Sequence, residues 1–427
     1  MVPKGWKRIP LEQVAEVRSG VAKGKTGLKD PVTVPYLRVA NVQDGHINLD
    51  EVKEIEIERD KMDRFSLKKG DVLMNEGGDF DKLGRGDVWQ GQIEPCLHQN
   101  HVFAVRPNSE MIDSFFLAAL AASYYGKTYF LSCAKRSTNL ASINSKQIKE
   151  FPALVPPLSE QKKIAKILST WDKAISTTEQ LLVNSQQQKK ALMQQLLTGK
   201  KRLLDNNEIK SRASKTPYAT LPSDWGEIAM EEVSSFITKG ATPTTYGFDW
   251  QDTGIPFLRS ECVGEDGFKE SGLAFICDEA HEAMKRSKVF TGDLLITITG
   301  NVGRICKLPD HICEANINQH IAKVTLNPQQ VNTDFIYHCL RDIKYRNYFE
   351  RITTGQAYPQ ISLVQVRDVV IPLPSREEQH KIANVLSTAD QEITALQQKL
   401  AALQQEKKAL MQQLLTGKRR VKVEEAA

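Results

Sequence analysis

Two long stretches of the chain carry apolar residues at alternating steps of four and three, with polar residues between them. A 3.5-residue period sustained over this length predicts α-helices that pair as a coiled coil. The apolar positions of this seam are Ile164, Leu168, Trp171, Ile175, Leu182, Leu192 and Leu196 in the first stretch, and Ile382, Leu386, Ile393, Leu396, Leu400, Leu403, Leu410 and Leu414 in the second. Ala389 and the polar residues Thr178, Ser185, Lys189 and Lys407 fill the remaining seam positions, in identical register.

The two stretches are copies of one cassette. Lys189–Lys200 recurs letter for letter at Lys407–Lys418, which is 218 residues later. The match extends to positions outside the seam, and this is more than a row of leucines requires. We therefore expect each copy to present the same surface to one of two identical partners, in addition to pairing with the other copy.

The sequence before each helix also repeats, more faintly. Short β-branched runs punctuated by glycine and proline recur in the same order, for example Val34–Arg38 and Ile255–Arg259, whereas the loops between them differ. This pattern predicts an α+β fold: two pseudo-repeated globular domains separated by two long helices that form an antiparallel coiled coil. The expected segments are domain 1 at 1–155, helix 1 at 156–199, a basic linker at 200–216, domain 2 at 217–373, helix 2 at 374–417 and a tail at 418–427.

The ends of the long helices carry recognisable signals. Ser375 and Glu378 fit a capping box at the start of the second helix, and Ser159 is the corresponding candidate cap in the first. Gly199 and Gly417 are placed to end the helices in the left-handed conformation. A parallel pairing would require the linker to run back along a whole helix, so its short length favours the antiparallel arrangement. The alternative is that each helix pairs with another protein.

Composition narrows the class of protein without identifying it. No apolar run is long enough to span a membrane, and no secretory signal is visible, so we expect a cytoplasmic protein. The seven cysteines are scattered and suit a reducing compartment. The net charge is +5, and the linker holds six basic and two acidic residues, which suits a solvated tether.

Nothing in the sequence nominates a catalytic group or a metal site. The segment Gly20–Thr26 resembles a phosphate-binding loop, but it has three residues between its glycines where the motif needs four. Cys96, His98 and His101 are close in sequence, yet the second domain keeps only the last of them, as His320, so structural histidines are the better interpretation. The sequence therefore indicates a binding protein.

With these features together, the chain resembles the DNA-specificity subunit of Type I restriction-modification systems. The resemblance covers essentially the whole chain and is carried by the Gly-Trp start, the Pro-x-Leu-Arg strands, the Gly-Asp-Leu-Leu turn, the Glu-Gln helix entries and the Leu-Leu-Thr-Gly-Lys helix ends. It implies two target-recognition domains that each read half of a bipartite, asymmetric site in double-stranded DNA. It also implies two adenine-N6 methyltransferase subunits and restriction/translocase subunits as partners. No cofactor is expected in this chain, because S-adenosylmethionine, ATP and Mg²⁺ would be bound by those partners.

The residues expected to contact DNA lie in polar, basic or aromatic loops beside the repeated strands. In domain 1 they are Lys23, Lys25, Lys82, Arg85, Lys135, Arg136 and Asn139, and in domain 2 they are Lys239, Thr244, Thr245, Tyr246, Arg304, Gln356 and Tyr358. The lysines suit phosphates, whereas the arginines, Asn139 and Gln356 suit base edges. The alternative function is a coiled-coil scaffold that binds proteins without reading DNA, and a hidden nuclease site is a third.

Overall fold

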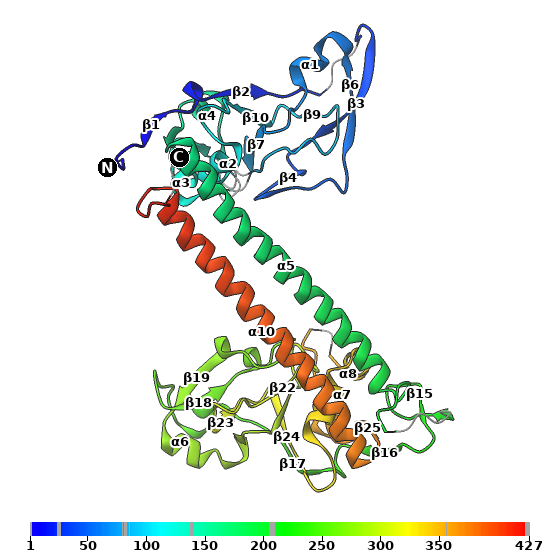
Figure 1. Ribbon diagram of the computed structural model, residues 1–427. Helices are drawn as coiled ribbons and strands as arrows, with labels where there is room; N and C mark the ends of the chain where they lie inside the picture. Colours follow the sequence, from blue (N-terminus) through cyan, green and yellow to red (C-terminus); the bar gives the residue numbers. More distant parts are fainter. Residues whose placement is uncertain are drawn as a thin grey trace. The chain divides into compact units, whose positions relative to one another are not determined.

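The computed structural model describes residues 2–23, 27–78, 80, 83–84, 86–136, 141–204, 210–355 and 357–422 (Figure 1). Contacts divide the chain into two compact units. Unit 1 holds the residues up to Gln180 together with those from Gln398 onward, and unit 2 holds Leu181–Gln397. Each unit therefore combines one globular domain with the first part of one long helix and the last part of the other.

The domain of unit 1 is built from short strands and helices. Its strands are β1 (Lys7–Pro10), β2 (Ala15–Ser19), β3 (Pro31–Leu37), β4 (Val42–Gln43), β5 (His46–Ile47), β6 (Lys53–Glu58), β7 (Val72–Asn75), β8 (Gly77–Gly78), β9 (Leu97–His98), β10 (Val102–Pro107), β11 (Lys135–Arg136), β12 (Ala141–Ser142) and β13 (Pro152–Val155). Its helices are α1 (Met62–Phe65), α2 (Ser114–Ala122), α3 (Tyr124–Cys133) and α4 (Ser145–Lys149), followed by the long helix α5 (Leu158–Leu196).

Unit 2 repeats this arrangement with different loops. Its strands are β14 (Ser211–Ala213), β15 (Thr220–Pro222), β16 (Gly226–Ala229), β17 (Ser234–Lys239), β18 (Ile255–Leu258), β19 (Leu273–Ile276), β20 (Lys288–Phe290), β21 (Leu294–Thr297), β22 (Ile305–Lys307), β23 (Glu314–Ile317), β24 (Ile321–Leu326) and β25 (Val370–Leu373). Its helices are α6 (Asp278–Ala283), α7 (Thr333–Arg341), α8 (Ile343–Ile352) and α9 (Leu363–Arg367), followed by the long helix α10 (Arg376–Leu414).

The sheets confirm the repeated frame. The sheet β2-β10-β7 of unit 1 corresponds to β17-β24-β21-β22 of unit 2, and β6-β3-β9 corresponds to β19-β18-β23-β20. In the second pair of sheets, one strand runs parallel to its neighbour in both units, with Tyr36 opposite Leu97 and Phe257 opposite Asn316. The predicted α+β class with two pseudo-repeated domains is therefore correct, and each domain holds its main sheet against a pair of helices, α2 with α3 or α7 with α8.

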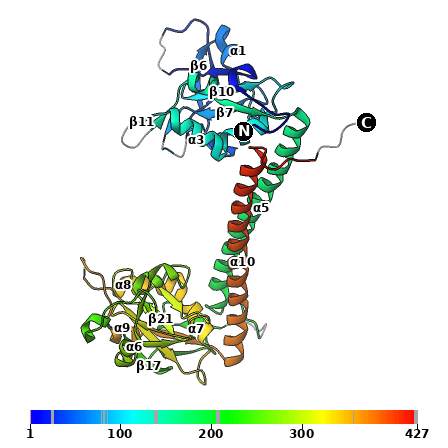
Figure 2. The same ribbon diagram turned by 90° about the vertical axis from the view of Figure 1, so that its left-hand side faces the viewer.

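The helices α5 and α10 pair in opposite directions within each unit (Figures 1 and 2). In unit 1 the early α5 residue Asp172 forms an ion pair with the late α10 residue Lys407, and in unit 2 the late α5 residue Lys189 pairs with the early α10 residue Asp390. Every predicted seam position is buried or half-buried, while most positions between them are exposed. The antiparallel coiled coil is confirmed.

A buried glutamate near the start of each long helix joins the globular domain to the paired helices. In unit 1, Trp6 donates its indole N–H to Glu160 at 3.1 Å, and Arg420 donates to both carboxylate oxygens at 2.6 and 2.8 Å. In unit 2, Trp225 and Arg202 make the same contacts with Glu378 at the same distances. We call these two groups the Trp–Glu–Arg clamps. The arginine of each clamp follows the C-terminal end of the other helix, so the clamp ties both helices to one domain.

The glutamines next to these glutamates add hydrogen bonds between each long helix and its domain. Gln161 accepts a hydrogen bond from the Asp113 backbone at 2.8 Å, and Gln379 accepts one from the Asn332 backbone at the same distance. Both glutamine side chains are buried and also donate to backbone carbonyls before their helix. The repeated Glu-Gln pairs therefore hold the helix starts against the domains.

Two predictions about the helix ends need correction. Ser159 does not cap α5, because the helix already begins at Leu158, and Pro157 stands at the position that corresponds to Ser375. The Ser375 hydroxyl accepts from the Glu378 backbone at 3.3 Å, but the Glu378 carboxylate belongs to its clamp and does not complete a capping box. Gly199 and Gly417 do adopt the left-handed conformation, with φ of +67° and +69°.

The linker is also more ordered at its ends than a solvated tether. The side chain of Arg202 is 11% exposed, and Arg212 donates to the Trp225 backbone at 2.7 Å. The strand β14 pairs with β15, which fixes residues 211–213 within unit 2. Residues 205–209 of the linker lie outside the described residues.

Candidate nucleic-acid interface

In unit 1, three other segments of the chain meet at the turn between β9 and β10. Two backbone hydrogen bonds join the loop after β2 to this turn. The Val21 N–H donates to the His98 carbonyl at 2.8 Å, and the Asn100 N–H donates to the Val21 carbonyl at 3.0 Å. The loop after β7 is bonded to it by Glu76 N–H donating to the His101 carbonyl at 2.9 Å, and Ile143 after β12 donates to the Glu76 carbonyl at 2.8 Å. Loops from four places in the sequence therefore form one surface around His101.

Unit 2 builds the same junction around His320. The loop after β17 is held by Ala241 N–H donating to Ile317 at 3.2 Å. Ile298 N–H donates to the His320 carbonyl at 2.9 Å, and Ile361 N–H donates to the Ile298 carbonyl at 3.0 Å. These bonds match those of Glu76, His101 and Ile143, so the backbone of the junction repeats even where the side chains do not.

A glycine at the end of β2 and of β17 makes this junction possible. A Cβ atom on Gly20 would lie 2.0 Å from the His98 carbonyl oxygen, and one on Gly240 would lie 1.8 Å from the Ile317 carbonyl oxygen. Any side chain would therefore push the loop away from the turn. This close backbone approach explains the first glycine of the segment that resembled a phosphate loop, whereas residues 24–26 lie outside the described residues.

In unit 1 the junction opens into a hollow of about 540 Å³. It is lined by the hairpin residues Lys135 and Arg136, by His101 and Glu76, and by the glycines of β8. Nδ1 of His101 contacts the Glu76 carboxylate, and the Arg136 guanidinium lies 5.9 Å from the centroid of the Phe80 ring. The hollow thus holds cationic side chains, one of which lies close to an aromatic ring, a combination that nucleic-acid sites use.

In unit 2 the corresponding surface is aromatic and amide-rich. Tyr358 is 60% exposed, and its ring centroid lies 6.3 Å from that of His320. The Gln319 side chain donates to His320 Nε2 at 3.1 Å and accepts from the Thr242 hydroxyl at 2.6 Å. The two junctions therefore share a backbone and differ in what they offer to a ligand.

The predicted DNA-contacting residues are distributed unevenly over these surfaces. Lys135, Arg136 and Tyr358 lie at the junctions, whereas Lys23 and Lys239 are exposed in or beside the loops that enter them. Thr244, Thr245 and Tyr246 form an exposed 3-10 turn in the loop after β17. The predicted residues Lys25, Lys82, Arg85, Asn139 and Gln356 lie outside the described residues.

Arg304 pairs with an acidic residue of its own unit, Glu265. Its guanidinium lies 3.6 Å from Glu265, and it lines a cavity of about 400 Å³ together with Lys189, Arg341 and Arg346. Its role as a base reader stays a prediction, and it would require the guanidinium to leave Glu265.

The three residues considered as metal ligands separate in the structure. His98 is buried and hydrogen-bonded through Nδ1 to the Val102 carbonyl at 2.6 Å, and burial lowers its pKa to about 4. Burial raises the pKa of the Cys96 thiol to about 12. His101, in contrast, is exposed at the junction. The structural interpretation is correct for His98, whereas for the exposed His101 and its counterpart His320 it stays a prediction.

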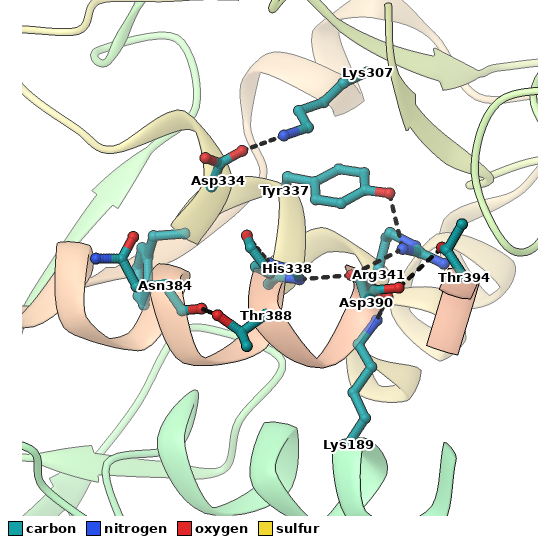
Figure 3. Close-up of polar contacts among 12 residues, drawn as sticks. Lys189, Lys307, Asp334, Tyr337, His338, Arg341, Asn384, Thr388, Asp390 and Thr394 are labelled. Carbon is teal, nitrogen blue, oxygen red and sulfur yellow. Dashed lines mark hydrogen bonds and ion pairs between the residues drawn. The ribbon is translucent and has the colours of Figure 1, made fainter. Parts of the chain in front are cut away.

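A polar network joins helices α5, α7 and α10 in unit 2 (Figure 3). Asp390 of α10 pairs with Lys189 of α5 and lies 3.8 Å from both Arg341 and His338 of α7. Burial lowers the pKa of His338 to about 2, with the nearby cations contributing, so this imidazole is neutral. The positions in α2 that correspond to His338 and Arg341 are alanines, Ala119 and Ala122, so the first domain lacks this network.

Comparisons with known proteins identify the family to which the repeated domains belong. The family profile described as Type I restriction modification DNA specificity domain matches residues 3–184 and again 222–405. A putative type I restriction enzyme MjaX specificity subunit from Methanocaldococcus jannaschii is 28% identical over 99% of this chain and 95% of its own length. The EcoBI specificity subunit from Escherichia coli is 24% identical over 88% of this chain and 77% of its own length.

Solved structures share the fold. The Type-I restriction-modification system S subunit from M. genitalium matches 97% of this chain and 99% of its own with a TM-score of 0.59 and 14% identity. The chain therefore belongs to the family of DNA-specificity subunits of Type I restriction-modification systems. In the part of the chain that the structure describes, no helix is both long and apolar enough to cross a membrane.

Proposed function

We propose that this chain is the non-catalytic subunit that selects the DNA site of a Type I complex, each domain reading one half of a bipartite, asymmetric sequence. The observation that carries the proposal is the junction built twice around His101 and His320, with one backbone and two sets of side chains. A common backbone would position each domain on DNA in the same way, while unlike side chains would select different bases.

The side chains at each junction suit DNA. Lys135 and Arg136 would contact phosphates or guanine edges, and Tyr358 would stack against a base or pack on a sugar. The second function considered, a scaffold that binds proteins without reading DNA, would not account for a junction that repeats its backbone and varies its side chains. A subunit with this function would work beside the chromosome, in the cytoplasm of a prokaryotic cell.

The paired helices are the proposed docking site for two methyltransferase subunits. The repeated cassette is exposed at the same positions in both copies, among them Lys190 and Lys408, and Gln194 and Gln412. Identical exposed surfaces in two units suit two copies of one partner. Restriction/translocase subunits would join through those partners, and S-adenosylmethionine, ATP and Mg²⁺ would be bound by the partners and not by this chain.

Selection from a random duplex library tests the DNA-reading proposal. The full chain, assembled with its methyltransferase partner, should enrich two short sequence blocks separated by a gap of fixed length. Arg136→Ala should relax one block and Tyr358→Ala the other, because each residue belongs to a different junction. Enrichment of no sequence at all, or binding that ignores salt concentration, would favour the scaffold function instead.

Charge reversal in the cassette tests the docking site. Lys190→Glu and Lys408→Glu should each reduce the number of methyltransferase copies bound to one chain from two to one, and the double variant should bind none. Native mass spectrometry reads this number directly. Lys399→Glu, at an exposed position of α10 outside the identical segment Lys407–Lys418, is the matched control and should keep both copies.

A further inference from the structure

We propose that His101 and His320 bind equivalent backbone phosphates, one in each half of the DNA site, and thereby set the register in which the neighbouring loops read bases. The inference rests on the proposed function, because it assumes that both domains contact DNA. It adds a positioning residue to each junction.

The two histidines stand at the same place in the repeated frame. The carbonyl of each histidine accepts a hydrogen bond from the backbone of the residue that follows an equivalent strand, Glu76 after β7 in unit 1 and Ile298 after β21 in unit 2, at 2.9 Å in both. The adjoining hairpins differ, with Lys135 facing the junction in unit 1 and Tyr358 in unit 2. The histidine is therefore a constant side chain among variable ones.

A constant side chain suits a constant ligand. The two halves of an asymmetric site differ in their bases but present the same sugar–phosphate backbone, and backbone contacts fix register without carrying sequence information. A residue repeated in two readers of different sequences is therefore better matched to a phosphate than to a base edge. The variable residues around it remain the candidates for base contacts.

The imidazole rings are held so that one nitrogen of each remains open. His101 pairs with Glu76 through Nδ1 and is 55% exposed, and no described residue hydrogen-bonds its Nε2. His320 accepts from Gln319 at Nε2, so its proton is on Nδ1, for which the described residues provide no acceptor. On His320 the Nδ1–H would donate to a phosphate oxygen. On His101 the Nδ1 proton points to Glu76, so Nε2 would donate to a phosphate oxygen in the protonated ring, the form in which the pair with Glu76 is ionic.

The partners also orient the rings before DNA arrives. Glu76 holds His101 from the side of β7, and Gln319 is itself fixed by the Thr242 hydroxyl at 2.6 Å. Each ring therefore loses less rotational freedom on binding than an unrestrained side chain would. In unit 1 the cations Lys135 and Arg136 line the same hollow and outnumber its one carboxylate, that of Glu76, so a phosphate held by His101 would still lie near a surplus of positive charge.

Methylphosphonate substitution tests the proposal, because it removes the charge of one phosphate at a time. The full chain is assembled with its methyltransferase partner and bound to the duplex that the wild-type complex selects. Wild type should lose about tenfold in affinity at one phosphate in each half-site. His101→Ala should bind the unmodified duplex about tenfold more weakly and lose nothing further at the phosphate of its own half-site, while staying sensitive at the other. His320→Ala should show the reverse pattern.

Several outcomes would overturn the inference. It fails if both variants keep the full methylphosphonate sensitivity of wild type, or if either variant changes the base preference at one position of its half-site. His101→Asn and His320→Asn keep one amide donor and guard against misfolding, and they should recover part of the affinity. His46→Ala removes an exposed histidine of β5 and should leave the affinity unchanged. A wild-type complex that selects no sequence would refute the proposed function itself. The comparison of histidine variants tests only the phosphate inference and leaves the proposed function standing.

Discussion

At the scale of single residues, Glu160 and Glu378 show how a sequence motif can hide its role. Both were visible as part of a repeated Glu-Gln pair, and Glu378 fitted a capping box. Their actual partners, a tryptophan and an arginine, lie 154 and 260 residues away for Glu160 and 153 and 176 residues away for Glu378. Local pattern rules cannot find such contacts. The repetition of all three residue types in both halves was the available signal.

We expect Glu378→Ala to lower the free energy of unfolding of unit 2 by about 2 kcal/mol, because it removes the acceptor of the Trp225 indole and leaves Arg202 with only the exposed carboxylate of Asp224. Urea denaturation followed by hydrogen exchange in β16 and β25 measures the loss. Glu377→Ala removes an exposed pair with Lys381 and should cost less than about 0.5 kcal/mol. Equal losses in the two variants would show that the clamp adds no stability.

His98 should make the stability of unit 1 depend on pH. Burial lowers its folded-state pKa from 6.5 to about 4, so below pH 6.5 the unfolded chain takes up a proton that the folded chain does not. The free energy of unfolding should therefore fall by about 1.4 kcal/mol per pH unit from pH 6.5 down to about 4. Above pH 6.5, His98 should cause no change of the free energy of unfolding with pH.

Urea midpoints at pH 7, 6 and 5 test this slope. His98→Gln should remove most of it, whereas His46→Gln, at an exposed position of the same unit, should leave it in place. An unchanged slope in His98→Gln would mean that other groups govern the acid sensitivity.

At the scale of elements, the helices were more predictable than the loops. A heptad pattern states directly which face of α5 and α10 is buried, so the seam could be derived from spacing alone. The strands β8, β11 and β12 have two residues each, and they exist only because loops from distant parts of the chain meet. For the same reason, the sequence could nominate Lys135 and Arg136 as basic but could not show that His101 lies beside them.

The two helix-pairing ion pairs should differ in strength. Asp390 is 32% exposed and serves Lys189, Arg341 and His338, whereas Asp172 is 57% exposed and its pairing with Lys407 has no counterpart to the α7 residues. We expect Asp390→Ala to destabilise unit 2 by about 2 kcal/mol, since it leaves the half-buried Lys189 unpaired. Asp172→Ala should cost unit 1 less than about 1 kcal/mol.

Hydrogen exchange of α7 and of α2 compares the two variants within their own units. Asp390→Ala should increase exchange in α7, and Asp172→Ala should leave α2 unaffected. Similar effects in both units would show that the Asp390 network contributes no more than a single ion pair.

At the scale of the whole molecule, the order of the sequence and the order of the units do not coincide. Unit 1 combines the beginning of the chain with its last helix turns, and Arg420 donates to the Lys4 backbone at 2.9 Å. Unit 2 is a single stretch of chain. Each unit has its own Trp–Glu–Arg clamp, and the clamp residues all lie outside the linker at 205–209. We therefore expect neither clamp to need a continuous chain through that linker.

A circular permutant should therefore fold. Joining residue 422 to residue 2 with a short flexible linker and opening the chain at 205–209 breaks no described contact of either clamp. We expect a melting temperature within about 4 °C of wild type, corresponding to a change of roughly 1 kcal/mol or less. Opening the chain within α5 instead, between Gln186 and Gln187, is the control and should lower the melting temperature further. An aggregated permutant opened at 205–209 would contradict the expectation.

The composition of the units also sets an order in time. Leu414 and Leu415 belong to the core of unit 1, and its clamp needs Arg420, so this unit lacks essential residues until the end of α10 leaves the ribosome. Unit 2 has all of its residues once Gln397 has emerged. Because a domain can close as soon as its chain is available, the half that is synthesised first is the half that is completed last.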